Sequence, residues 1–196
     1  MTLALLAGCS DSERVMSSVT SSDGSVLTSA APPPASIEIS PVVRSTDLGC
    51  SGNHSDVPAN YTVYFDAVAL PTTENYPMAL QTGSQLVPSQ PDADRPGRLF
   101  AKAGLYFKPG HSFEVVVPEA LRDRMSIGWS IRSWRVTVSD CRGVPSDWMA
   151  FVGGYWVADP FCAELILRSS GEERHVNIGL GAPCPGQAPP PTPSDV

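Results

Sequence analysis

Residues 162–184 read CAELILRSSGEERHVNIGLGAPC, and they predict a β-hairpin near the end of the chain. Two short apolar segments, 163–167 and 175–180, flank a polar turn region at 168–174. Short β-prone segments on both sides of a Gly-containing turn are typical of a hairpin. Folding this hairpin back near Gly171 brings Cys162 close to the segment that ends at Cys184.

Further strands are predicted by apolar side chains that recur at every second residue, the period of a half-buried strand. The sets are Tyr61, Val63 and Phe65; Phe113, Val115 and Val117; Ile127, Trp129 and Ile131; and Trp134, Val136 and Val138. The last two sets differ in parity, so a bulge or corner is expected near Arg132 and Ser133. Only 118–124 has a helical pattern. The chain is therefore predicted to be all-β, a single antiparallel β-sandwich of seven to nine strands, Ig-like or jelly-roll-like, with disordered N- and C-terminal tails.

The spacing of the cysteines favours disulfides over a metal site. Besides Cys9 there are four widely spaced cysteines, without a Cys-x-x-Cys pair, and the three histidines are scattered. No metal and no cofactor is predicted. Four cysteines allow three connectivities, and the predicted hairpin favours Cys162–Cys184, which leaves Cys50–Cys141.

The N-terminus carries an apolar segment that ends in Leu6-Ala7-Gly8-Cys9. This tetrapeptide resembles the lipobox of bacterial lipoproteins. The resemblance implies that residues 1–9 are a truncated lipoprotein signal segment and that Cys9 carries the lipid. Residues 10–36 are rich in Ser and Pro and lack hydrophobic periodicity, which is the composition of a flexible tether.

The β-sandwich domain is predicted over residues 37–185, followed by a Pro-rich, extended and solvated tail at 186–196. Residues 153–157 and 179–185 are similar to segments of uncharacterised exported proteins of high-GC Gram-positive bacteria, a resemblance that implies no particular activity. Together with the lipobox, it implies an extracytoplasmic protein that a lipid anchors to the cell membrane.

Composition and motifs exclude several functions. The net charge of −7 argues against a nucleic-acid partner, because phosphate contacts need a basic face. Sequence motifs of serine hydrolases, zinc proteases, phosphate-binding loops and dinucleotide-binding folds are absent. Paired carboxylates that meet only in space leave no such local signature.

Charge is distributed unevenly along the chain. Residues 95–142 contain nine basic and four acidic residues, a net charge of +5, so the remainder carries −12. Within this segment, Arg132 and Arg135 lie near Trp129 and Trp134, which makes the two arginines a candidate binding face. The alternative places the Trp rings in the core and leaves the Arg side chains as ordinary solvated residues.

These observations predict a lipid-anchored β-sandwich of the cell envelope with a non-catalytic binding or interaction role. The expected partners are the membrane, through the anchor, and either an anionic envelope polymer or an envelope protein. Two alternatives remain: an envelope hydrolase whose site is assembled in space, and an accessory subunit of an envelope complex.

Overall fold

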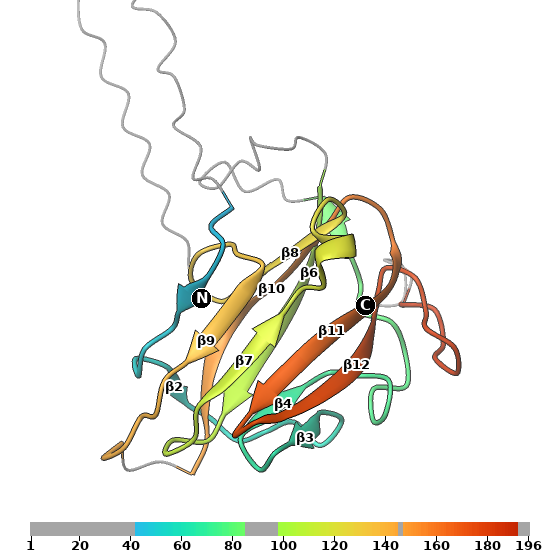
Figure 1. Cartoon of the computed structure of the whole chain (residues 1–196). Helices are drawn as coiled ribbons and strands as arrows, with labels where there is room; N and C mark the ends of the chain where they lie inside the picture. The colour runs from blue at the N-terminus through green and yellow to red at the C-terminus, as the bar shows by residue number, and fades with distance from the viewer. Residues whose placement is uncertain (1–41, 85–97, 145–146, 192–196) are drawn as a thin grey trace, which may run out of the picture. The chain divides into compact units, whose positions relative to one another are not determined.

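The computed structural model describes residues 42–84, 98–144 and 147–191 (Figure 1). The predicted signal segment at 1–9, with Cys9, and the predicted tether at 10–36 lie outside these residues. Within them the chain forms twelve strand segments and a single turn of 3-10 helix, Glu119–Leu121. The prediction of an all-β chain is confirmed. The helical pattern at 118–124 corresponds to this turn, which Pro118 precedes.

One sheet has five strands in the order β1-β9-β7-β11-β12 and is called sheet B below. Its strands are β1 (Thr46–Asp47), β7 (Phe113–Val116), β9 (Arg135–Val138), β11 (Phe161–Ser169) and β12 (Glu172–Leu180). All neighbours are antiparallel except β1 and β9, which run parallel.

The other sheet has seven strands and is called sheet A. Its main path runs β2-β10-β6-β4-β3, while β5 pairs with β6 and β8 pairs with β10. Its strands are β2 (Asn53–His54), β3 (Thr62–Tyr64), β4 (Val68–Leu70), β5 (Gly83–Ser84), β6 (Leu99–Phe107), β8 (Met125–Gly128) and β10 (Met149–Val157). The number of strands exceeds the predicted seven to nine because several segments have only two or three residues.

The inward faces of the two sheets enclose one hydrophobic core, as in a β-sandwich. Leu105 and Phe107 of sheet A and Leu165 and Leu167 of sheet B have no exposed surface. The ring of Phe107 contacts that of Phe113, with centroids 6.5 Å apart, and so joins β6 to β7. Burial of each such side chain contributes about 1.5–3 kcal/mol, so the alternating pattern accounts for much of the stability.

Sheets A and B are also joined by a corner in the chain between β8 and β9. The residues of β8 pair with β10, and those of β9 pair with β7. This corner explains the change of parity predicted near Arg132. One detail differs from the apolar pattern, because Ile127 and Trp129 are buried whereas Ile131 is 50% exposed. The strand β8 ends before Ile131, so the alternation no longer directs this side chain inward.

The hairpin predicted from residues 162–184 is present, and its strands are longer than expected. Strands β11 and β12 pair over nine residues each, from Phe161 opposite Leu180 to Ser169 opposite Glu172. Ser170 and Gly171 occupy the turn with φ of 50° and 82°. Two consecutive residues with positive φ match the twist of a two-residue hairpin turn, and Gly adopts this conformation without steric cost.

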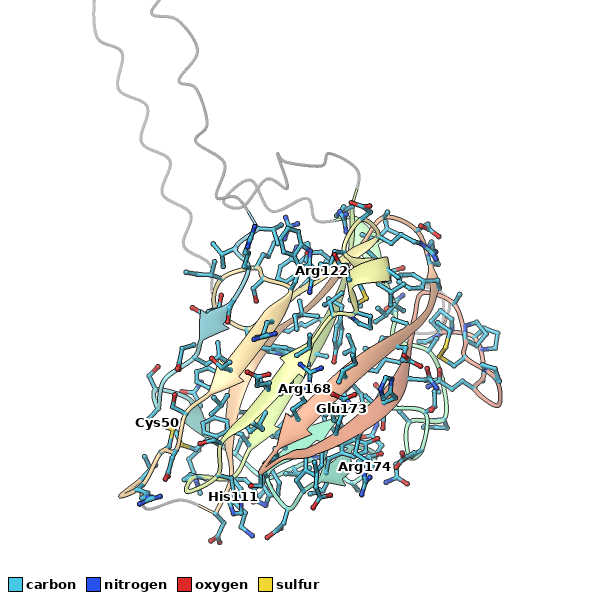
Figure 2. The ribbon with its side chains drawn as sticks, viewed as in Figure 1. Cys50, His111, Arg122, Arg168, Glu173 and Arg174 are labelled. Atoms are coloured by element: carbon cyan, nitrogen blue, oxygen red, sulfur yellow. A yellow bond between two sulfur atoms is a disulfide. The ribbon has the colours of Figure 1, made fainter. Side chains whose placement is uncertain are left out.

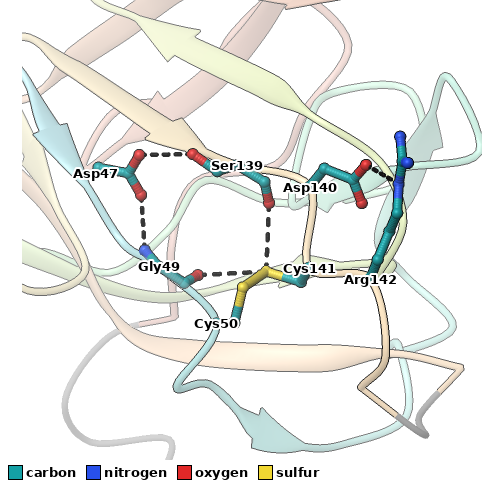
Figure 3. Close-up of a disulfide and its surroundings, with 7 residues drawn as sticks. All are labelled: Asp47, Gly49, Cys50, Ser139, Asp140, Cys141 and Arg142. Carbon is teal, nitrogen blue, oxygen red and sulfur yellow. Dashed lines mark hydrogen bonds and ion pairs between the residues drawn. A yellow bond between two sulfur atoms is a disulfide. The ribbon is translucent and has the colours of Figure 1, made fainter.

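The structure contains two disulfides, Cys50–Cys141 and Cys162–Cys184, in agreement with the favoured pairing. The first joins the segment after β1 to the segment after β9 (Figure 3). Beside it, the Asp47 carboxylate accepts hydrogen bonds from the Gly49 N–H at 2.8 Å and from the Ser139 hydroxyl at 2.7 Å. Since disulfides persist in oxidising compartments, the pair indicates a location outside the cytoplasm.

The C-terminal segment stays packed beyond Cys184. The Gln187 side-chain amide donates to the carbonyl oxygen of Tyr76 at 2.8 Å, and the Ala188 N–H donates to that of Pro77 at 2.8 Å. Pairing with the rest of the domain therefore continues past the boundary predicted at residue 185. Among the described residues, no helix is both long and apolar enough to cross a membrane.

Candidate binding site

The outer face of sheet B carries a chain of ion pairs that runs across its strands. Glu114 of β7 lies 3.8 Å from Arg135 of β9 and 3.9 Å from Arg168 of β11, measured between oxygen and nitrogen. Arg168 continues the chain with a 2.7 Å ion pair to Glu173 of β12 (Figure 2). Cross-strand pairs of opposite charge stabilise a sheet modestly, and here each charge is already matched by a neighbour.

His175 extends this chain at the edge of the sheet. Its Nδ1 lies 2.9 Å from Glu164 Oε1, and its Nε2 lies 3.1 Å from Glu173 Oε1. Hydrogen bonds to Glu164 and then to Glu173 raise the pKa of His175 above its usual value. In the other direction, hydrogen bonds from Arg168 and His175 lower the pKa of Glu173. Both ring nitrogens of the histidine are thus engaged by carboxylates.

An open groove of about 530 Å³ lies beside these ion pairs, at the end of sheet B where the β11–β12 turn is found. Glu114, Arg168 and Glu173 line it together with several serines. The Ser139 hydroxyl donates to Asp47, and the Ser169 hydroxyl donates to the Ser112 carbonyl oxygen at 2.8 Å. The charges of Glu114, Arg168 and Glu173 and these two hydroxyls are therefore engaged in contacts within the domain.

A second, smaller pocket of about 170 Å³ has a different character and is called the arginine pocket below. It is lined by Val42, Arg98, Arg122, Met125, Ser126, Arg132 and Trp134. Three of these residues are arginines, and no acidic residue lines the pocket within the part of the chain that the structure describes. The pocket lies at the first residues of β8, Met125 and Ser126, next to the 3-10 turn, and Figure 2 shows Arg122 at this end of the domain.

Arg98 is held in the wall of this pocket by backbone carbonyl groups. Its guanidinium donates to the carbonyl oxygens of Asp123 at 2.7 Å, Arg124 at 2.8 Å and Trp156 at 3.4 Å. The residue is 7% exposed. Arginine remains charged in proteins, so these contacts fix a positive charge at low exposure.

The other two guanidinium groups lie over tryptophan rings. That of Arg122 is 5.9 Å from the centroid of Trp134, and that of Arg132 is 5.4 Å from the centroid of Trp156. The Trp134 indole N–H also donates to the Arg122 carbonyl oxygen at 3.3 Å, and Arg132 Nε donates to the Ser126 hydroxyl at 3.3 Å. Stacking restricts the rotation of a flexible side chain and so orients its donors before any ligand arrives.

The structure separates the two arginines that the sequence grouped as one candidate binding face. Arg132 lines the arginine pocket, whereas Arg135 pairs with Glu114 on the outer face of sheet B. Trp129 belongs to neither site. It is 4% exposed and packs in the core against Tyr155, with ring centroids 5.6 Å apart. Sequence reasoning missed Arg98 and Arg122, because only the pairing of distant strands brings them to Arg132.

Sheet A carries an aromatic cluster beside β6. The Tyr61 ring contacts Tyr106 edge-on, with centroids 5.1 Å apart, and Tyr76 at 6.2 Å. Burial raises the pKa of Tyr61 to about 12, so its hydroxyl stays neutral. On the outward side of β10 and β3, Val152 is 67% and Val63 is 45% exposed.

Comparisons of this chain with protein-family models, with curated proteins and with solved structures found no match. Within the ranges that the structure describes, no group of three or more His, Cys, Asp or Glu side chains could hold a metal ion.

Proposed function

We propose that this protein is a lipid-anchored binding protein of the bacterial cell envelope, whose domain binds an anionic envelope polymer without catalysing a reaction. The arginine pocket is the observation that carries the proposal. Its three guanidinium groups line a cavity to which none of the described residues contributes a carboxylate. Since the protein as a whole has a net charge of −7, a pocket of this sign is a local feature that complements an anionic ligand.

Two observations support the proposed location at the cell envelope. The two disulfides indicate an oxidising compartment, and the Leu6-Ala7-Gly8-Cys9 tetrapeptide supports a lipid on Cys9. A lipid anchor would keep the binding domain at the membrane surface, where envelope polymers are concentrated. We extend the proposal to the fold and assign the sandwich to the Ig-like or jelly-roll-like type, with the crossing of the chain from β8 to β9 between sheets as support.

The alternative of an envelope hydrolase has less support. The groove on sheet B is the larger cavity, and its carboxylates pair with Arg135, Arg168 and His175. A general acid or base needs a carboxyl group that faces the substrate with a pKa suited to proton transfer. Here the pKa of Glu173 is lowered, which is the opposite of what a general acid requires.

A second candidate, an accessory subunit of an envelope complex, is favoured by one observation. Val63 and Val152 are the most exposed large apolar residues of sheet A. Because β6 and β4 lie between β10 and β3, the two valines would contact a partner at two separate points rather than through one apolar patch. Substitution of both by Thr would preserve β-branched side chains and remove the apolar surface, so co-purification with an envelope partner should be lost only if this candidate is right.

Binding to soluble polyanions of defined charge tests the main proposal. The full chain should bind poly(glycerol phosphate) with an affinity that falls as salt rises from 0.1 to 1 M, where the Debye length shrinks from about 10 Å to about 3 Å. Arg132→Gln should weaken this binding, and Arg135→Gln should leave it unchanged, since Arg135 pairs with Glu114 at 3.8 Å outside the pocket. The proposal would be refuted if the affinity changed neither with salt nor in Arg132→Gln.

The anchor is tested separately. Cells that express the protein from its native gene are labelled with a palmitate analogue, and the native sequence is compared with Cys9→Ser. We expect label only in the protein with Cys9. Equal labelling of the two would end the lipoprotein interpretation without affecting the polymer test.

A further inference from the structure

The volume of the arginine pocket limits its ligand to one small group. Its 170 Å³ compares with about 30 Å³ for a water molecule in the liquid and with about 300–1,000 Å³ for pockets that hold drug-sized molecules. A segment of polymer therefore does not fit inside. A single charged group of that polymer, which has the volume of a few water molecules, does fit inside the pocket.

One donor in the pocket lacks a partner. The Nε atom of Arg122 is buried and makes no hydrogen bond within the part of the chain that the structure describes. A buried N–H without an acceptor costs about 1–3 kcal/mol, more when the group is charged, and therefore calls for a ligand or an ordered water. The Arg122 guanidinium lies over the Trp134 ring, 5.9 Å from its centroid, and both side chains line the cavity.

The three guanidinium groups reach the pocket from different parts of the fold. Arg98 belongs to the segment that enters β6, Arg122 follows the 3-10 turn, and Arg132 lies in the corner between β8 and β9. A carboxylate has two oxygens in one plane and suits a single guanidinium fork. A tetrahedral oxyanion presents oxygens in several directions and can accept hydrogen bonds from donors on several sides.

We propose that the arginine pocket is a specific site for one tetrahedral oxyanion of the phosphate class, held by Arg98, Arg122 and Arg132. This inference rests on the proposed function and names the group of the polymer that enters the pocket, a backbone or terminal phosphate. Arg98 and Arg132 supply positive charge in the wall, while Arg122, which lies over Trp134, supplies a buried donor that lacks a partner among the described residues. The pocket thus distinguishes phosphate polymers from polycarboxylates of equal charge density.

The test is a titration of the full chain with inorganic phosphate, sulfate and acetate at constant ionic strength, followed by tryptophan fluorescence, since Trp134 lines the pocket. We expect saturable binding of one phosphate per chain, at least tenfold tighter than acetate. Arg122→Gln should weaken phosphate binding at least tenfold, and Arg122→Lys should also weaken it, because Lys keeps the charge but lacks the fork. Arg142→Gln is the matched control, because its side chain is 86% exposed and pairs with Asp140 outside the pocket.

Thermal unfolding of each variant shows whether it is folded, and Arg132→Gln replaces Arg122→Gln if the latter is not. Acetate binding as tight as phosphate binding, or phosphate binding that Arg122→Gln and Arg132→Gln leave unchanged, would overturn the inference. If poly(glycerol phosphate) still binds in that case, and its binding depends on salt and on Arg132, the proposed function survives. Phosphate and phosphatidylglycerol vesicles could bind while poly(glycerol phosphate) does not. In that case the pocket takes the phosphate of a lipid headgroup, so the polymer proposal fails and the phosphate site stands.

Discussion

The indole N–H of Trp129 donates a hydrogen bond to the carbonyl oxygen of Ala103 at 2.9 Å. This bond joins the corner after β8 to the middle of β6, two segments that are not neighbours in the sheet path. The Trp129 ring also meets Tyr155 edge-on. The Trp129 side chain therefore fixes the corner to sheet A through one polar and one aromatic contact.

Trp129→Ala should destabilise the domain by about 3–5 kcal/mol, because the substitution leaves a cavity in the core. Trp129→Phe keeps an aromatic ring but loses the hydrogen bond to Ala103, so a smaller loss of about 1–3 kcal/mol is expected. Trp134→Phe is the matched control, because Trp134 is only partly buried and its N–H bond to Arg122 is longer, at 3.3 Å. Urea unfolding of the three variants provides the comparison, and equal midpoints for Trp129→Ala and the native protein would contradict the core assignment.

Gly153→Ala should be among the most damaging single-methyl additions in sheet A. The new Cβ would lie 2.6 Å from the Cα and 2.7 Å from the Cδ1 of Trp129, and it would also meet the backbone of Gly128. Because backbone atoms must move, the expected loss is about 3 kcal/mol. Gly83→Ala meets no described atom within 4 Å and should change the free energy of unfolding by about 1 kcal/mol at most. A Gly153→Ala protein as stable as Gly83→Ala would show that β8 and β10 approach less closely.

The two disulfides should differ in their contribution to stability. The chain-entropy model predicts a larger effect for the longer loop, and the sequence separations are 91 for Cys50–Cys141 and 22 for Cys162–Cys184. Replacing both cysteines of a bridge by Ser should cost about 2–5 kcal/mol, with a loss about 1 kcal/mol greater for Cys50–Cys141. Calorimetric unfolding of the two double variants tests the order, and the reverse order would assign more of the effect to the hairpin itself.

His175 predicts a pH dependence of stability with a definite sign. The folded-state pKa is raised by Glu164 and Glu173, so the stabilisation is fully present below the unfolded-state value of 6.5 and is lost as the pH rises through the folded-state pKa. The thermal midpoint of the native protein should therefore fall as the pH rises from 6.5 through the folded-state pKa of His175. The fall should be smaller in His175→Gln. A double variant, Glu164→Gln with Glu173→Gln, should flatten the profile while the histidine remains.

Glu173 contributes the opposite dependence in acid. Since its pKa is lowered, its stabilisation is present above the unfolded-state value of 4.5 and is lost as the pH falls through the folded-state pKa. The acidic region, where Glu173 loses its contribution, and the region above pH 6.5, where His175 loses its contribution, can be measured in one pH series. A slope above pH 6.5 that is identical in the native protein and in His175→Gln would rule out the histidine as its source.

The features that the sequence predicted correctly are those that short-range patterns control. The hairpin between Cys162 and Cys184 follows from two β-prone segments around Gly171, and the disulfide pairing follows from the hairpin. The corner after β8 was visible as a change of parity near Arg132. In each case the information lies within about twenty residues of chain.

Features that depend on strand pairing were not predictable in this way. In β3, the buried side chains are Thr62 and Tyr64, while Val63 faces outward. The Tyr64 hydroxyl is within hydrogen-bond distance of the Thr72 hydroxyl, at 2.6 Å, so a polar pair makes this burial possible. The arginine pocket has the same origin. Arg98, Arg122 and Arg132 have no common motif, and only the folding of β6, β8 and β9 brings them together.

The parallel pairing of β1 with β9 has a mechanical consequence. A pulling force that reaches the domain through the chain before Val43 would load the hydrogen bonds of Val43 with Arg132 and of Leu48 with Thr137 in shear, so that they resist together. If they break, the chain can be drawn out only as far as Cys50, where the covalent bond to Cys141 stops further extension. Within the stretch that is drawn out, Leu48 is the one described residue of the hydrophobic core, so the remaining core residues are not pulled directly while β1 detaches.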